Sequence, residues 1–145
     1  MPSFRIMDLA GNEINMDALR GKVVFVNFWA TWCAPCLAEL PRLEKEIWRK
    51  FKSEDFVMIA IAREQSKDEI AEFKIARQLT FPMASDPQRE IFSLFANGGI
   101  PRSYVVSGDG QILYQSDGYV PSEFGKIRTV IEKELRKLRE AKASG

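Results

Sequence analysis

The chain has 145 residues, which suits one globular domain and is too short for two. Apolar residues make up 46% and charged residues 28%, a composition that excludes disorder for most of the chain. The 21 basic and 20 acidic residues leave a net charge of +1, so we expect no nucleic-acid partner. The chain has no His, which excludes His-based catalytic triads and His metal sites.

The first predicted elements are a hairpin and a buried strand. Residues 3–19 carry apolar side chains on both sides of Gly11-Asn12, a typical hairpin turn. Residues 23–28 are nearly all apolar and β-forming, which predicts a strand covered on both faces. A helix is predicted after the two cysteines, and Pro41 is expected to kink it.

Strands and helices alternate in the middle of the chain. The apolar run 56–62 predicts a second buried strand, and the segment 66–79 begins with the spacing of a capping box and predicts a helix. Residues 81–83 are expected to be a short extended piece. Asp86 is predicted to cap a brief helix, which ends at Asn97-Gly-Gly99.

The C-terminal part is predicted to contain an antiparallel hairpin within residues 104–114 and a last helix capped by Ser122. The order of elements indicates an α/β fold, in which helices cover both faces of a central mixed sheet. No linker or internal repeat divides the sequence, so we expect a single domain over residues 1–145. Its core covers about residues 3–140, and residues 141–145 form a frayed tail.

Both cysteines lie in one motif, Cys33-Ala34-Pro35-Cys36, where the first strand gives way to a helix. Unpaired N–H groups at a helix start stabilise an anion, so the pKa of the Cys33 thiol is expected below its usual value of about 8.5. A Cys33 thiolate could attack a partner's disulfide, and Cys36 could then release the partner. Two cysteines cannot fill a zinc site, so no metal is expected; inert thiols or half of a shared zinc site are the alternatives.

Four neighbours are expected to shape this site. Ala34 and Pro35 separate the cysteines and tune the reduction potential, and Pro35 suits the first turn of a helix. Trp29 and Trp32 are expected to shield the sulfur atoms and to offer a flat docking surface.

The segment Phe28-Trp-Ala-Thr-Trp-Cys-Ala-Pro-Cys36 resembles the active-site signature of the thioredoxin superfamily, and residues 26–33 resemble its TlpA/ResA (DsbE/CcmG-like) branch. The resemblance covers about residues 3–140, including the N-terminal hairpin and the inserted helix. It implies a thioredoxin fold and a thiol–disulfide oxidoreductase that needs no cofactor besides a Cys33–Cys36 disulfide. It also implies protein disulfide or dithiol substrates and an upstream thiol reductant; some members of the branch are reductants in cytochrome c maturation.

The resemblance assigns a second segment to the site. Pro101 falls where the superfamily places a cis-proline that faces the Cys pair, and Ile100 would present its backbone to an extended substrate segment. A trans proline that merely starts a strand is the alternative. Arg102 departs from the small or acidic residue expected next, so the preferred substrate at this edge is open.

Two polar residues complete the expected site. Glu39 falls where the TlpA/ResA branch has a partly buried Glu that exchanges protons with the Cys pair. Burial would raise the pKa of Glu39 and allow it to exchange a proton with Cys36. A solvated helix carboxylate is the alternative. Asn27 replaces the ionisable Asp of thioredoxins proper, as expected of the branch, and could equally be a core amide with its hydrogen bonds satisfied.

Two other functions are considered beside disulfide reduction. Peroxiredoxins, which are thiol peroxidases, share the fold, but their active-site pattern has a Thr three residues before the reactive Cys. Thr31 lies only two residues before Cys33, which argues against a thiol peroxidase. A redox-independent binding module or chaperone could use the surface around Trp32.

We expect a monomer that reaches a membrane only through a leader or anchor absent from this sequence. The resemblance implies an extracytoplasmic location, periplasmic or membrane-anchored; with no signal in the chain, a cytoplasmic one stays open.

Overall fold

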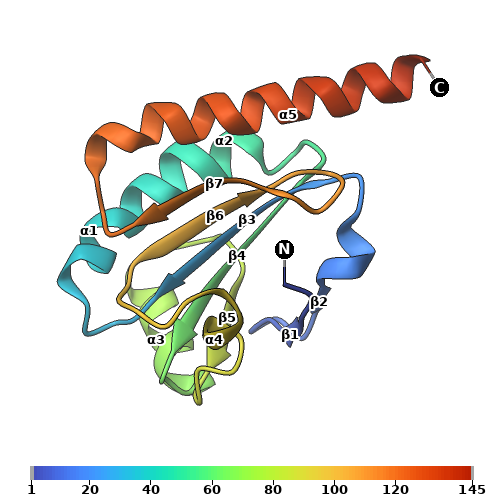
Figure 1. The fold of residues 1–145 in the computed structure, drawn as a ribbon. Coiled ribbons are helices and arrows are strands. Elements are labelled where there is room, and N and C mark those ends of the chain that lie inside the picture. The colour runs from blue at the N-terminus through green and yellow to red at the C-terminus, as the bar shows by residue number, and fades with distance from the viewer. Residues whose placement is uncertain (1, 145) are drawn as a thin grey trace.

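The computed structural model describes residues 2–144. A five-stranded sheet with the order β5-β4-β3-β6-β7 forms the centre of the molecule, and a separate two-stranded sheet lies near the N-terminus (Figure 1). The strands are β1 (Arg5–Met7), β2 (Glu13–Asn15), β3 (Val23–Trp29), β4 (Phe56–Arg63), β5 (Met83–Asp86), β6 (Arg102–Val106) and β7 (Ile112–Asp117).

Helices lie on both faces of this sheet, which confirms the predicted thioredoxin-type α/β class (Figure 1). They are α1 (Ala34–Arg42), α2 (Arg49–Phe51), α3 (Lys67–Ala76), α4 (Phe92–Phe95) and α5 (Phe124–Ser144). The inserted helix α3 begins with the predicted capping box, in which Ser66 and Glu69 bond each other's backbone N–H groups.

The pairing of the strands brings distant parts of the sequence to one edge of the sheet. Strand β3 runs parallel to β4 and antiparallel to β6. The end of β3, the end of β4 and the start of β6 therefore meet at the same edge. The Cys motif follows β3, and Pro101 immediately precedes β6, so the topology places both beside each other.

One face of the sheet is covered by α1, α2, α3 and α5. Phe25 of β3 and Met58 of β4 belong to this core, together with Ile47 and Ile131 from the covering helices. Alternate side chains of β3 point to this face, and Asn27 is therefore directed toward α1 rather than toward solvent. A polar side chain of β3 is thus buried within this core.

The opposite face is covered by the N-terminal hairpin and α4. Phe28 lies at its centre, with ring centroids 5.3 Å from Phe92 and 6.2 Å from Tyr104. Phe4 closes the cluster from the hairpin side. Because both faces are covered, every residue of β3 is buried, as the continuous apolar run predicted.

Three local predictions differ from the structure. Asp86 ends β5 instead of capping a helix directly, and its carboxylate accepts N–H groups from Ile91 and Phe92 after an intervening turn. The predicted cap at Ser122 is wrong, because residues 121–123 form a 3₁₀ turn before α5 begins. Residues 141–144 belong to α5 rather than to a frayed tail, and Gly145 lies outside the described residues.

The helix that follows the Cys motif changes its hydrogen-bond pattern after Pro41. Residues 43–48 form a π-helical turn between α1 and α2. Proline lacks the backbone N–H that would bond to the carbonyl four residues earlier, so the regular α-helical pattern is interrupted at Pro41. Within residues 2–144, no helix is long and apolar enough to cross a membrane.

Candidate active site

The two cysteines are joined as a disulfide at the start of α1, with their Cα atoms 5.2 Å apart. Cys33 is the N-cap residue of this helix, and its sulfur accepts a hydrogen bond from the Cys36 N–H at 3.3 Å. Cys33 is 7% exposed, whereas Cys36 is completely buried. Of the two cysteines, only Cys33 keeps any exposed surface, and the helix N-terminus stabilises negative charge on Cys33.

The segment before β6 forms the second wall of the site. The Ile100–Pro101 peptide bond is cis, as the resemblance implied. The carbonyl oxygen of Ile100 lies 3.8 Å from the sulfur of Cys33. The structure thus brings together two segments that are separated by 67 residues in the sequence.

Behind the cysteines, Asn27 and Glu39 form a buried polar pair. The Asn27 amide donates to a Glu39 carboxylate oxygen at 2.9 Å and to the Ser103 hydroxyl at 3.0 Å. Glu39 is only 4% exposed, so the solvated alternative for this residue is wrong. Glu39 follows Cys36 by three residues on the same helix, and both lie on its buried face.

Burial raises the pKa of Glu39 to about 7, because a charged carboxylate is costly in an apolar surrounding. The hydrogen bond from Asn27 opposes this shift, and the negative charge of Glu123 adds to it. The sequence contains no His, so Glu39 supplies a proton-exchanging group near neutrality that the composition alone did not provide.

The two tryptophans beside the motif have different environments. Trp32 is 58% exposed and forms an apolar surface next to Cys33. Trp29 is fully buried as the last residue of β3, and its ring packs 5.3 Å from that of Phe73 on α3. The prediction that Trp29 contributes to a flat docking surface is therefore wrong, because the strand and α3 enclose it.

Sequence reasoning missed Gln65, which holds the loop before the cysteines. Its side-chain oxygen accepts the Thr31 N–H at 2.7 Å, and its amide donates to the Thr31 hydroxyl at 2.5 Å. Gln65 is 4% exposed and lies just after the end of β4, at the same sheet edge as the Cys motif. Its position after a predicted parallel strand was the only signal in the sequence.

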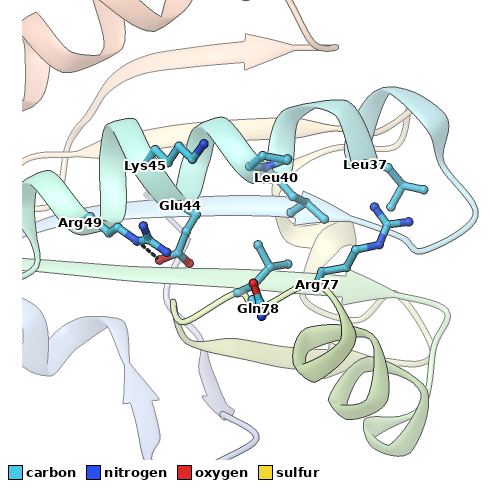
Figure 2. A pocket seen from close by; sticks show the side chains of 9 residues that line it. Leu37, Leu40, Glu44, Lys45, Arg49, Arg77 and Gln78 are labelled. Atoms are coloured by element: carbon cyan, nitrogen blue, oxygen red, sulfur yellow. Dashed lines mark hydrogen bonds and ion pairs between the residues drawn. The ribbon is translucent and has the colours of Figure 1, made fainter.

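A cavity of about 180 Å³ lies on another side of α1 (Figure 2). Leu37 and Leu40 line it from α1, and Arg77 and Gln78 lie opposite. At one end, Arg49 pairs with Glu44 at 2.8 Å. No cysteine lines this cavity, so it borders the helix of the redox site without being part of that site.

The fold and the Cys33–Cys36 pair define a thiol–disulfide oxidoreductase of the thioredoxin superfamily. The AhpC/TSA family model matches residues 1–115, and the chain belongs to this family as a TlpA/ResA-like member. The thiol-disulfide oxidoreductase ResA of Bacillus anthracis is 34% identical over 117 residues, which are 81% of this chain and 67% of the relative. ResA of Bacillus subtilis is 30% identical over 112 residues, covering 77% and 62% respectively.

Solved structures agree with this assignment. A proposed protein disulfide isomerase from Bacteroides thetaiotaomicron is 33% identical, with a TM-score of 0.88 over 93% of this chain and 87% of that chain. A proposed thiol:disulfide interchange protein DsbE from Chlorobium tepidum is 25% identical, with a TM-score of 0.82 over 92% and 94%. Both similarities extend over nearly the whole chain.

The raised pKa of Glu39 predicts how stability depends on pH. Between the ordinary value of 4.5 and about 7, the folded protein binds a proton at Glu39 that the unfolded chain has released, so its stability falls as pH rises. The full loss corresponds to about 3 kcal/mol. Urea unfolding of the disulfide form at pH 5 and pH 8 should show this loss in the wild type and a much smaller one in Glu39→Gln.

The matched control is Glu132→Gln on α5, where the side chain is 46% exposed. This variant should keep the wild-type pH dependence. Equal pH dependence in the wild type and in Glu39→Gln would contradict a raised pKa at Glu39.

Proposed function

We propose that this oxidoreductase works as a reductant of protein disulfides, with Cys33 as the attacking thiolate and Cys36 as the resolving one. The observation that carries this assignment is the difference in exposure between the two cysteines, because Cys33 keeps 7% of its surface exposed and Cys36 keeps none. The helix N-terminus at the same sulfur supports the choice of Cys33 as the nucleophile.

In the proposed reaction, the Cys33 thiolate attacks one sulfur of a partner's disulfide and the other partner sulfur leaves as a thiolate. The Cys36 thiolate then attacks Cys33, which forms the Cys33–Cys36 disulfide and releases the second partner thiolate. Two electrons pass from the domain to the partner, whose thiolates take up two protons. An upstream dithiol reverses these steps and restores the reduced domain.

We assign the proton of Cys36 to Glu39. Cys36 is fully buried, so a base from solvent cannot reach its thiol directly. Glu39 lies one helical turn away on the same buried face, and its pKa of about 7 suits proton exchange at neutral pH. Asn27 acts as a positioning residue, because its amide holds the Glu39 carboxylate.

The docking surface in this proposal consists of Trp32, Ile100 and Pro101. Trp32 offers an exposed apolar ring, and the Ile100 carbonyl next to Cys33 is placed to accept an N–H from an extended partner segment. Ala34 and Pro35 fix the spacing between the sulfur atoms at the start of α1. Trp29 supports this surface from inside, where it packs against α3.

The partners and location follow the resemblance to the TlpA/ResA branch. We propose that the domain acts outside the cytoplasm as a monomer, receives electrons from an upstream thiol reductant, and serves disulfides such as those that arise in cytochrome c maturation. Relatives named as thiol-disulfide oxidoreductases ResA support this placement.

Paired Cys variants test the mechanism. Cys33→Ser should abolish insulin disulfide reduction, because no accessible thiolate remains. Cys36→Ser should accumulate a mixed disulfide with the partner, detectable by mass spectrometry under non-reducing conditions. Wild-type activity in Cys33→Ser would disprove the assignment of the nucleophile. Rapid peroxide consumption by Cys36→Ser would favour a thiol peroxidase instead.

The role of Glu39 predicts the pH profile of exchange. In the wild type, the single-turnover rate with a model disulfide should change slope near pH 7, where Glu39 titrates. Glu39→Gln should lose this inflection, and Glu132→Gln should keep it. An unchanged inflection in Glu39→Gln would remove the proton role from this residue and leave the Cys assignments intact.

The direction of electron flow is tested by the reduction potential of the Cys pair. A reductant should equilibrate with glutathione redox buffers at a potential close to that of thioredoxin, about −270 mV, rather than that of an oxidant such as DsbA, about −120 mV. A value near the latter would reverse the proposed direction. Partner binding that is indifferent to dithiothreitol would instead indicate a redox-independent binding module.

A further inference from the structure

Three arginines gather at the sheet edge that carries the redox site: Arg63 at the end of β4, Arg89 after β5 and Arg102 at the start of β6. We call them the arginine cluster. Arg63 donates to the Gly98 carbonyl at 3.0 Å, and Arg102 donates to the Gly99 carbonyl at 2.8 Å. Two members of the cluster therefore contact the loop that leads into Ile100 and Pro101.

The cluster is continuous with the exposed surface beside Cys33. The guanidinium carbon of Arg63 lies 5.9 Å from the ring of Trp32 on one side and 4.7 Å from the ring of Phe92 on the other. Arg89 lies 5.2 Å from the same Phe92 ring. Aromatic rings and guanidinium groups thus alternate from Trp32 to Arg89, and this row borders the place where a partner would approach.

Arg63 is poorly satisfied for its degree of burial. It is only 8% exposed, and its Nε atom is buried without a hydrogen-bond acceptor within residues 2–144. The Nε atom of Arg89 also lacks a well-directed hydrogen bond, but it lies 3.3 Å from a Glu64 carboxylate oxygen, and the Arg89 side chain is 38% exposed. Burial, with the charges of Arg89 and Arg102 nearby, lowers the pKa of Arg63 from its ordinary value. Buried charge without close partners is costly, which indicates that an anion completes the arrangement.

The carboxylates nearby do not fill this role. Glu64 lies 3.3 Å from Arg89 and 4.0 Å from Arg63, the outer limit of an ion pair, and its side chain is 41% exposed. Asp117 reaches Arg102 at 3.4 Å but is 70% exposed. Asp86 is buried, and its two oxygens accept the N–H groups at the start of α4.

We propose that the arginine cluster binds a carboxylate side chain of the partner protein, next to the disulfide under attack, and so selects acidic partner segments. This inference rests on the proposed function and specifies its substrate class. The proposed position of the anion borders Trp32 and the Gly98–Gly99 loop. The next residue in this loop is Ile100, whose carbonyl oxygen lies 3.8 Å from the sulfur of Cys33. An extended segment docked at Ile100 therefore carries its flanking side chain over the cluster.

The competing interpretation is that Arg63 and Arg102 only hold the loop through its carbonyl groups. Under that interpretation, losing an arginine slows exchange with acidic and neutral partners by the same factor. Under our proposal, it reduces the preference for acidic partners. The ratio of the exchange rates with acidic and neutral partners therefore distinguishes binding of a carboxylate from positioning of the loop.

The experiment compares two synthetic peptides with one intramolecular disulfide each, identical except that the residues flanking it are Asp and Glu in one and Asn and Gln in the other. The reduced protein should reduce the acidic peptide about tenfold faster at low salt, since local charge acts mainly on association. The ratio should shrink in 300 mM NaCl through screening. A ratio of one at low salt would overturn the proposal.

Variants locate the effect. Arg102→Gln and Arg89→Gln should each lower the ratio of acidic to neutral rates, and Arg63→Lys should preserve part of it because it keeps the charge. The matched control is Arg139→Gln on α5, which removes the same charge far from the site. An equal fall of the ratio in Arg139→Gln, or an unchanged ratio in both cluster Gln variants, would refute the proposal.

A binding measurement keeps this test independent of the redox mechanism. Cys-free versions of the two peptides are titrated into the disulfide form of the protein, with Trp fluorescence as the readout, because Trp32 is exposed beside the cluster. The acidic peptide should bind more tightly, and equal binding would contradict the proposal. Failure to reduce either disulfide peptide, with tighter binding of the acidic peptide retained, would instead reject the proposed function alone.

Discussion

The hydrogen bond from the Cys36 N–H to the sulfur of Cys33 is the interaction around which the site is built. It exists because β3 ends at Trp29 and α1 starts five residues later, so Cys33 occupies the N-cap of a helix. The same helix buries the second sulfur completely. One short connection between two elements thus supplies charge stabilisation at one sulfur and protection of the other.

In the proposed mechanism, a buried polar pair in the core supplies the proton chemistry of the site. Asn27 interrupts an otherwise apolar strand, and its amide is held between Glu39 and Ser103. The amide nitrogen of Asn27 is hydrogen-bonded, whereas its Oδ1 atom is buried without a partner within residues 2–144. The neighbouring carboxyl group responds to burial by a rise in its pKa. The protein thereby obtains a group that titrates near neutrality without any histidine.

The surface around the nucleophile combines apolar and cationic character. Trp32 supplies the apolar part, and the arginine cluster lies directly behind it. The chain as a whole is nearly neutral, so its composition gives no indication of this local charge. The local charge that our proposal uses thus arises from which strand ends the sheet brings together, and not from the overall balance of acidic and basic residues.

Local periodicity and spacing were enough to predict the α/β order, the buried strands, the capping box of α3 and the Cys motif at a strand-to-helix junction. The packing of the folded chain was needed to show that Cys33 keeps some exposed surface and Cys36 none, how far Glu39 is buried, and that Trp29 is enclosed. It also placed Gln65 and Arg63 at the site. Access, burial and contacts between strand ends depend on residues far apart in the sequence, and packing fixes them only once the sheet has formed.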